Sequence, residues 1–139
     1  MTRTFLIVVF ILGVTLSAHA AKLSIGNWDP GGDIETYELW WKRIAQSGVT
    51  VRINGACVSA CSMVLGLVPA SRVCITPRAK FGLHMASIDG VPNKRLTREF
   101  VRDYYPKWVQ DWIRTQPPLT DDLTWLTPPA IGKHLKRCR

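Results

Sequence analysis

The stretch INGACVSACSMVLGL, Ile53 to Leu67, joins a strand-like segment to a wholly apolar run. Ser59 stands at the joint, with Cys57 two residues before it and Cys61 two residues after it. The letters VTVRI just upstream alternate β-branched and polar residues, which predicts a strand. The letters SACSMVLGLV are apolar nearly all round, which predicts a buried helix. The stretch therefore predicts a strand-to-helix joint in the core, with a hydroxyl group at the start of the helix.

The flanking sequence predicts an α/β fold with a largely parallel sheet, because strand and helix patterns alternate along it. A short strand pattern ends in the turn DPGGD, and a helical pattern with Gly48 as its stop follows. Beyond the central stretch, two further strand patterns lie on either side of Pro77. The helical pattern that begins at Leu96 is interrupted near Pro106.

Residues 1–20 have the pattern of a secretory signal peptide. Arg3 supplies a short basic region, an apolar run spans Phe5–Leu16, and the letters AHA at 18–20 form a small-x-small cleavage site. A membrane anchor is the alternative, but the run is shorter than the roughly 20 apolar residues that a spanning helix needs. We therefore expect cleavage after position 20 and one domain over residues 21–139. The mature protein would be periplasmic or secreted, without stable membrane insertion.

Export predicts that the four cysteines form disulfides, and four cysteines allow three complete pairings. Cys57 and Cys61 are the first candidates, because residues across a turn can bring their Cα atoms within disulfide range. Pairing of Cys61 with Cys74 is the alternative. With Cys57 and Cys61 joined, Cys138 is expected to be free or intermolecular. The cysteine spacing does not resemble a zinc site, so we expect no metal and no other cofactor.

The chain has a net charge of +8, and basic residues gather in its last letters, GKHLKRCR. A basic tail of this kind can meet phosphate, lipid head groups or only solvent. No nucleic-acid-binding motif accompanies it, and an exported protein rarely meets nucleic acid. We therefore expect residues 115–139 to be a loosely structured, solvated segment, and we expect no nucleic-acid partner.

Ser59 has two interpretations. As a helix N-cap, its hydroxyl accepts a hydrogen bond from an early backbone N–H and stabilises the helix by about 1 kcal/mol. As a nucleophile, it stands where unpaired N–H groups carry partial positive charge and can stabilise an oxyanion. A nucleophile also needs a base and a second oxyanion donor. His84 on a later strand is the candidate base, and Gly31 and Gly32 after an earlier strand are the candidate donors.

Three motifs in order, DPGGD, GACVSACSMVL and RVCITPRAKFGLH, resemble the Clp protease proteolytic subunit and its exported relatives in the Clp/crotonase superfamily. The resemblance covers roughly residues 23–84. It implies a small Clp/crotonase-like domain with a mostly parallel sheet of ββα-type units flanked by helices. It also implies Ser59 as the nucleophile and His84 as the general base. The implied oxyanion hole is made by backbone N–H groups of Gly31, Gly32 and Ala60.

The family orients its histidine with an acid placed just before an aromatic-Leu-Ser/Thr segment, which WLTPPAIG resembles. The family position corresponds to Leu123, two residues before Trp125. The nearest acids are Asp122 and Asp121. We therefore expect Asp122 to orient His84 across a one-residue shift in a loop, with Asp121 as the second candidate.

Together these residues imply an exported serine-type hydrolase, a peptidase or esterase that acts on a peptide or ester substrate. A homo-oligomer is left open. The alternative is a non-catalytic exported protein that keeps the scaffold for binding or assembly, with Ser59 only as a helix cap. An acyl-CoA-handling crotonase is disfavoured, because export removes the protein from coenzyme A.

Overall fold

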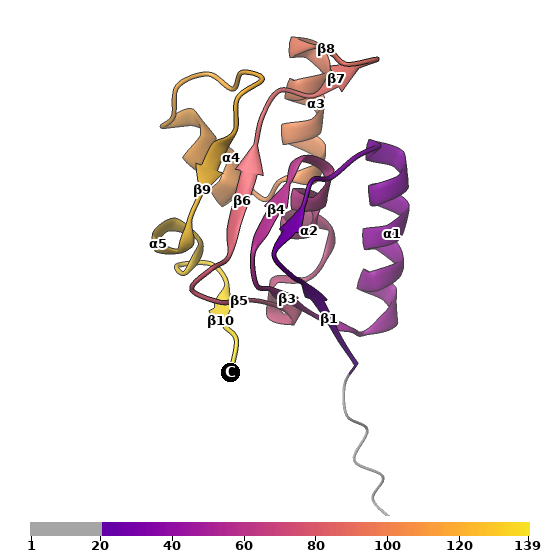
Figure 1. The fold of residues 1–139 in the computed structure, drawn as a ribbon, viewed down its shortest axis with the longest axis vertical. Coiled ribbons are helices and arrows are strands. Elements are labelled where there is room, and N and C mark those ends of the chain that lie inside the picture. The colour runs from indigo at the N-terminus through magenta and orange to yellow at the C-terminus, as the bar shows by residue number, and fades with distance from the viewer. Residues whose placement is uncertain (1–20) are drawn as a thin grey trace, which may run out of the picture.

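The computed structural model describes residues 21–139, so the predicted signal peptide lies outside the described residues. Figure 1 shows a mixed α/β arrangement in which parallel strands are flanked by helices. The strands form two four-stranded sheets and one small hairpin, whereas the sequence predicted a single sheet. None of the helices within residues 21–139 is long and apolar enough to cross a membrane.

Sheet A has the strand order β1-β3-β5-β10, and all of its neighbouring strands are parallel. Its strands are β1 (Lys22–Ile25), β3 (Thr50–Ile53), β5 (Val73–Ile75) and β10 (Lys136–Arg137). Sheet B has the order β2-β4-β6-β9, with β9 antiparallel to β6 and the other pairs parallel. Its strands are β2 (Trp28–Asp29), β4 (Ala56–Val58), β6 (Lys80–Leu83) and β9 (Thr124–Leu126). The hairpin joins β7 (Ser87–Ile88) to β8 (Val91–Pro92).

The longest helix of the described chain, α1 (Ile34–Ser47), begins and ends with the predicted signals. Asp33 caps its first turn by accepting the Thr36 N–H at 2.8 Å. Gly48 ends it with a left-handed φ of 75°, which glycine adopts without a steric penalty.

The central apolar run is buried, as predicted, but it is not one helix. It consists of a 3₁₀ helix (Ser59–Met63) followed by the single turn α2 (Val64–Leu67). An apolar pattern all round indicates burial without fixing the helical period, which is why the two segments were not separated from the sequence. A second 3₁₀ turn (Ala70–Arg72) leads into β5.

The later helices surround sheet B. The helical pattern after Leu96 is divided at Pro106, as expected, into α3 (Lys94–Tyr104) and α4 (Lys107–Arg114). A short helix, α5 (Pro128–Ile131), connects β9 to the last strand.

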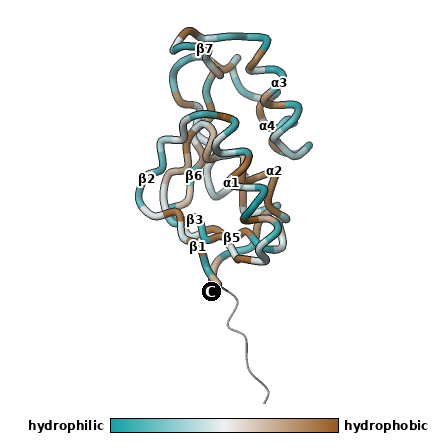
Figure 2. Tube along the Cα trace, turned by 90° about the vertical axis from the view of Figure 1, so that its right-hand side faces the viewer, coloured by the Kyte–Doolittle hydropathy of each residue, from teal (hydrophilic) through white to brown (hydrophobic). Residues whose placement is uncertain are grey.

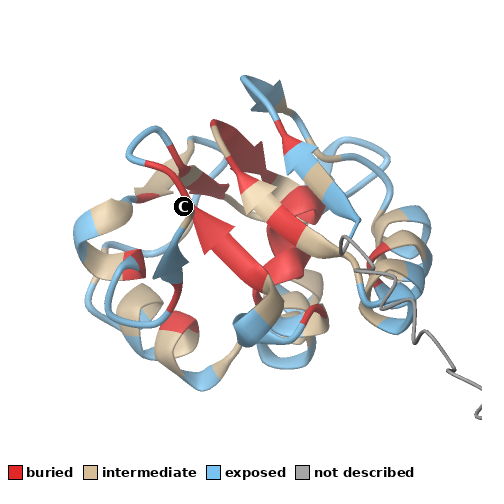
Figure 3. Cartoon of the chain, turned by 90° about the horizontal axis from the view of Figure 1, so that it is seen from below, coloured by how far each residue is buried: buried red, intermediate tan, exposed pale blue. Residues whose placement is uncertain are grey.

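The core lies between the sheets and the helices. Trp41, Met63 and Phe81 are fully buried there, each on a different element. Figure 2 shows α2 in hydrophobic colours, and Figure 3 shows buried residues in the central strands with exposed residues on the outer sides of the helices.

The C-terminal segment differs from its prediction. Residues 115–139 contribute a strand to each sheet instead of forming a loose tail. The structure contains the expected Cys57–Cys61 disulfide, with Cα atoms 5.3 Å apart. The second disulfide joins Cys74 to Cys138, so the expectation of a free or intermolecular Cys138 was wrong. The physical reason is the pairing of β10 with β5, which brings the end of the chain beside Cys74.

Candidate active site

Three parallel strands of sheet B carry the three motifs that the sequence singled out. The strands β2, β4 and β6 are neighbours, so their carboxyl ends meet at one edge of the sheet. The glycine turn follows β2, Ser59 follows β4 and His84 follows β6. This is the edge at which open α/β sheets bind ligands.

Ser59 and His84 line the same small hollow at this edge, which has a volume of about 70 Å³. Gly32, from the motif DPGGD, also lines it. The remaining lining residues are Ile34, Ala86, Ser87, Phe100 and Tyr105. Within the described chain, no hydrogen bond joins the Ser59 hydroxyl to His84, and the Ser59 carbonyl oxygen accepts from the Ser62 hydroxyl. A hydroxyl, an imidazole and a glycine backbone therefore line the same hollow.

The backbone of Ser59 is strained. Its φ is 54°, in the left-handed region that non-glycine residues rarely adopt. A residue held there costs on the order of 1–3 kcal/mol, and such residues cluster at functional sites. Ser59 does not cap the following helix, because Val58 occupies the N-cap position and no side chain makes the capping hydrogen bond. The cap interpretation of Ser59 therefore lacks the contact that it requires.

A buried hydrogen-bond chain holds the backbone of this serine. The Ser62 hydroxyl donates to the Ser59 carbonyl oxygen and pairs with the Tyr105 hydroxyl at 2.6 Å. Burial of Tyr105 raises the pKa of its phenol well above the usual range, so this hydroxyl stays protonated. Sequence reasoning missed both residues. A serine three positions after Ser59 was the only local signal, and it did not point to Tyr105.

Gly31 packs directly against the serine. Its φ is 75°, and a Cβ added to it would meet the Val58 carbonyl oxygen, with the Ala60 nitrogen and the Ser59 Cβ each 2.8 Å away. Separations below 3.0 Å do not occur for real Cβ atoms, so glycine is required at this position. The close approach brings the glycine turn and the start of the 3₁₀ helix together.

The side chain of Asp29 holds the glycine turn in place. Its carboxylate accepts the Gly31 N–H at 2.9 Å and the Tyr37 hydroxyl at 2.6 Å. Partial burial, and then the hydrogen bond to Asp29, raise the pKa of Tyr37 above its usual range. Because the Gly31 N–H is already bonded, Gly31 supports the site rather than donating to an oxyanion. Asp29 was read in the sequence only as part of the turn.

The backbone N–H groups of Gly32 and Ala60 are the two remaining candidates for oxyanion donors. Gly32 lines the hollow itself. Ala60 is the second residue of the 3₁₀ helix, and the first N–H groups of a helix have no acceptor within it. Ala60 directly follows Ser59 in the chain, and Gly32 lines the same hollow as Ser59. This arrangement can stabilise negative charge on an oxygen in the hollow.

The loop that carries the candidate acids lies next to His84, since the Met85 N–H donates to the Thr120 carbonyl oxygen at 2.8 Å, but no ion pair of the described residues joins Asp121 or Asp122 to His84. Asp121 and Asp122 are exposed and do not line the hollow, and the Asp122 N–H donates to Thr120 Oγ1 at 3.2 Å in a turn. The register of β6 and β9 ends with Leu83 opposite Thr124. A Cβ on Gly82 would lie 3.2 Å from Leu123 Cδ2, so the Leu123 side chain lies on the face of sheet B that Gly82 shares with positions two residues away along β6.

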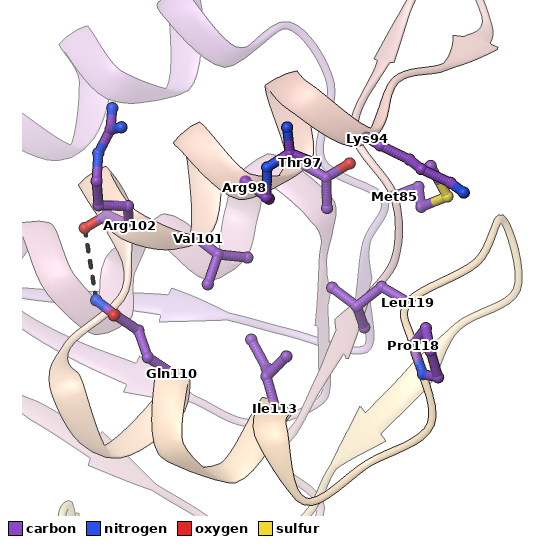
Figure 4. Close-up of a pocket in the computed structure, with 10 residues that line it drawn as sticks. All are labelled: Met85, Lys94, Thr97, Arg98, Val101, Arg102, Gln110, Ile113, Pro118 and Leu119. Carbon is purple, nitrogen blue, oxygen red and sulfur yellow. Dashed lines mark hydrogen bonds between the residues drawn. The ribbon is translucent and has the colours of Figure 1, made fainter.

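A second hollow, of about 440 Å³, lies between α3, α4 and residues 118–119. Figure 4 shows Val101, Ile113 and Leu119 directed into it. Met85 lines this hollow, whereas His84 and Ala86 line the smaller one. The segment 84–86 therefore separates the two hollows, and the larger one does not contain the candidate nucleophile.

No family model matches the chain, and a search of curated proteins finds no match for it. Among the described residues, no group of three or more His, Cys, Asp or Glu side chains is placed to hold a metal ion. The site must therefore be interpreted from its own geometry.

Proposed function

We propose that the chain is an exported serine-type hydrolase, a peptidase or esterase, built on a Clp-protease-like domain. One observation carries the proposal. A strained serine that makes no capping bond shares a hollow with a histidine and a glycine backbone at the ends of three neighbouring parallel strands. The two disulfides fit an oxidising compartment, which supports export.

In the proposed reaction, Ser59 Oγ attacks the carbonyl carbon of the substrate and His84 takes the hydroxyl proton. The N–H groups of Gly32 and Ala60 stabilise the resulting oxyanion. His84 then gives the proton to the leaving group, and an acyl group remains on Ser59. Attack by water on this ester, with His84 again as the base, releases the acid and restores the serine.

No ion pair of the described residues joins a carboxylate to His84, and this sets the expected rate. Without an orienting carboxylate, the imidazole is not held in one tautomer, and the loss in related sites is as large as about 10⁴-fold. We therefore propose a slow Ser59–His84 pair. The second candidate is a binding or assembly protein on this scaffold. It is favoured by Leu123, which stands at the position where the resembled family has its orienting acid.

Burst kinetics with an activated ester such as p-nitrophenyl acetate distinguish the two candidates. The hydrolase predicts a fast release of one equivalent of p-nitrophenol per folded chain, followed by a slower steady rate, because the acyl group accumulates on Ser59. Ser59→Ala should abolish the burst. Ser87→Ala is the matched control, since Ser87 lines the same hollow, and it should keep the burst. Equal traces for wild type and Ser59→Ala would favour the binding protein.

A further inference from the structure

One face of sheet A carries a cluster of basic side chains. The register aligns Arg52 with Cys74 and Cys74 with Lys136, so these side chains share one face of the sheet. Lys22 lies on the same face, because it is two positions before Ser24, which the register aligns with Arg52. The alternate residues Val51, Ile53, Val73 and Ile75 are buried on the opposite face, against the core. The sheet therefore has one apolar side and one cationic side.

This face contains no acid to neutralise it. All ten Asp and Glu residues of the chain lie within 29–38 and 89–122. The four strands of sheet A come from other segments. The salt bridges of the described residues involve Lys42, Arg95, Arg102, Lys107 and Arg114, none of which lies on this face.

The end of the chain belongs to this face. The Cys74–Cys138 disulfide and the hydrogen bond from the Cys138 N–H to the Ile75 carbonyl oxygen, at 3.0 Å, hold β10 on the sheet. A hollow of about 440 Å³ is lined by cations from both ends of the described chain, namely Lys22, Arg52, Lys136, Arg137 and Arg139, together with Thr50, Cys74 and Cys138. The basic C-terminal segment GKHLKRCR was expected to be a solvated tail, but the disulfide and β10 hold it against sheet A.

We propose that this basic face binds the anionic head groups of a lipid bilayer. The first argument is charge complementarity, because cations near an anionic bilayer are attracted within a Debye length of its surface. The second is the position of the N-terminal sequence. The apolar run ends at Leu16, six positions before Lys22, and Lys22 lies on the basic face. The basic face therefore begins within six positions of the apolar run in the sequence.

The proposed orientation leaves the candidate active site accessible. Figure 1 shows β1 and β10 at the lower end of the molecule, and the β7–β8 hairpin, which follows His84, at the upper end. A bilayer at the basic face would therefore be on the far side from the hollow of Ser59. Peripheral binding of this kind needs no spanning helix.

Vesicle co-sedimentation tests the proposal with the oxidised chain 21–139, which contains every element of the described fold. We expect binding to vesicles of phosphatidylcholine with about one third phosphatidylglycerol, little binding to phosphatidylcholine alone, and loss of binding in high salt. Arg52→Glu with Lys136→Glu should weaken binding at least about thirtyfold, because each cation near the surface raises the partition constant about fivefold.

The matched control is Lys94→Glu with Arg95→Glu, which makes the same change in net charge at the first turn of α3, where acids are favourable. This control should bind the vesicles within about threefold of wild type, since it leaves the basic face intact. If Arg52→Glu does not fold, the exposed pair Lys22→Glu with Lys136→Glu replaces it. Equal loss in both charge-matched variants, or binding to a DNA duplex without binding to vesicles, would overturn the proposal.

Discussion

Replacement of Gly31 by alanine tests whether the glycine turn is fitted to the nucleophile. The left-handed φ of 75° costs an alanine about 1 kcal/mol. The new Cβ would also lie 2.8 Å from the Ala60 nitrogen and 2.8 Å from the Ser59 Cβ. Overpacking of this kind costs about 1–3 kcal/mol. We therefore expect Gly31→Ala to lower the free energy of unfolding by about 2–4 kcal/mol and to displace the turn from Ser59.

Gly32→Ala is the matched control on the adjacent residue. A Cβ there would meet only Tyr37 Cε2, at 3.5 Å, which is ordinary van der Waals contact. Its unfolding free energy should stay within about 0.5 kcal/mol of wild type. Urea unfolding followed by tryptophan fluorescence measures both variants, and the p-nitrophenol burst reports the site. If Gly31→Ala were as stable and as reactive as Gly32→Ala, the close fit of the turn to the serine would be wrong.

Three further predictions concern other parts of the fold. Leu123 stands where the resembled family has its acid, and its side chain lies on the Gly82 face of sheet B, so Leu123→Asp should raise the rate of ester acylation by about tenfold or more by orienting His84, whereas Leu123→Asn, without the charge, should not. Replacing Cys74 and Cys138 together by serine should lower the free energy of unfolding by about 4 kcal/mol, because their disulfide closes a loop of sequence separation 64; an unchanged urea midpoint would contradict this. Partial burial and a carboxylate hydrogen bond raise the pKa of Tyr104 from 10.0 to about 12, so its contribution to stability is present below pH 10 and lost as the pH rises to 12. The alkaline fall in the urea midpoint should be smaller in Tyr104→Phe.

Much of the fold followed from local patterns. Alternation predicted the strands on either side of the central stretch, and Gly48 and Pro106 ended their helices as expected. These signals act over a few residues and are therefore readable in the sequence. The division into two sheets could not be predicted from the sequence, because strands as short as Trp28–Asp29 have too few residues to show an alternating pattern.

The sequence indicated the candidate residues Ser59 and His84, but it did not indicate the residues that support them. Ser59 and His84 share one hollow because a sheet order that the sequence does not show brings their strands together. The contact of Ser62 with Tyr105 spans 43 positions, so no local motif indicates it. Asp122 as the orienting acid stays a prediction, because it lies in a loop just outside the paired residues of β6 and β9, where spacing along the sequence does not determine register.

The most direct test of the central claim is the site of fluorophosphonate attachment, mapped by peptide mass spectrometry on the oxidised, folded chain. A serine with a neighbouring imidazole reacts with this probe, whereas a helix-capping hydroxyl does not. The account predicts one adduct, on Ser59, that is strongly reduced in His84→Ala and retained in Ser87→Ala. Protein that stays unlabelled over a broad pH range, or an adduct on another hydroxyl, would contradict it.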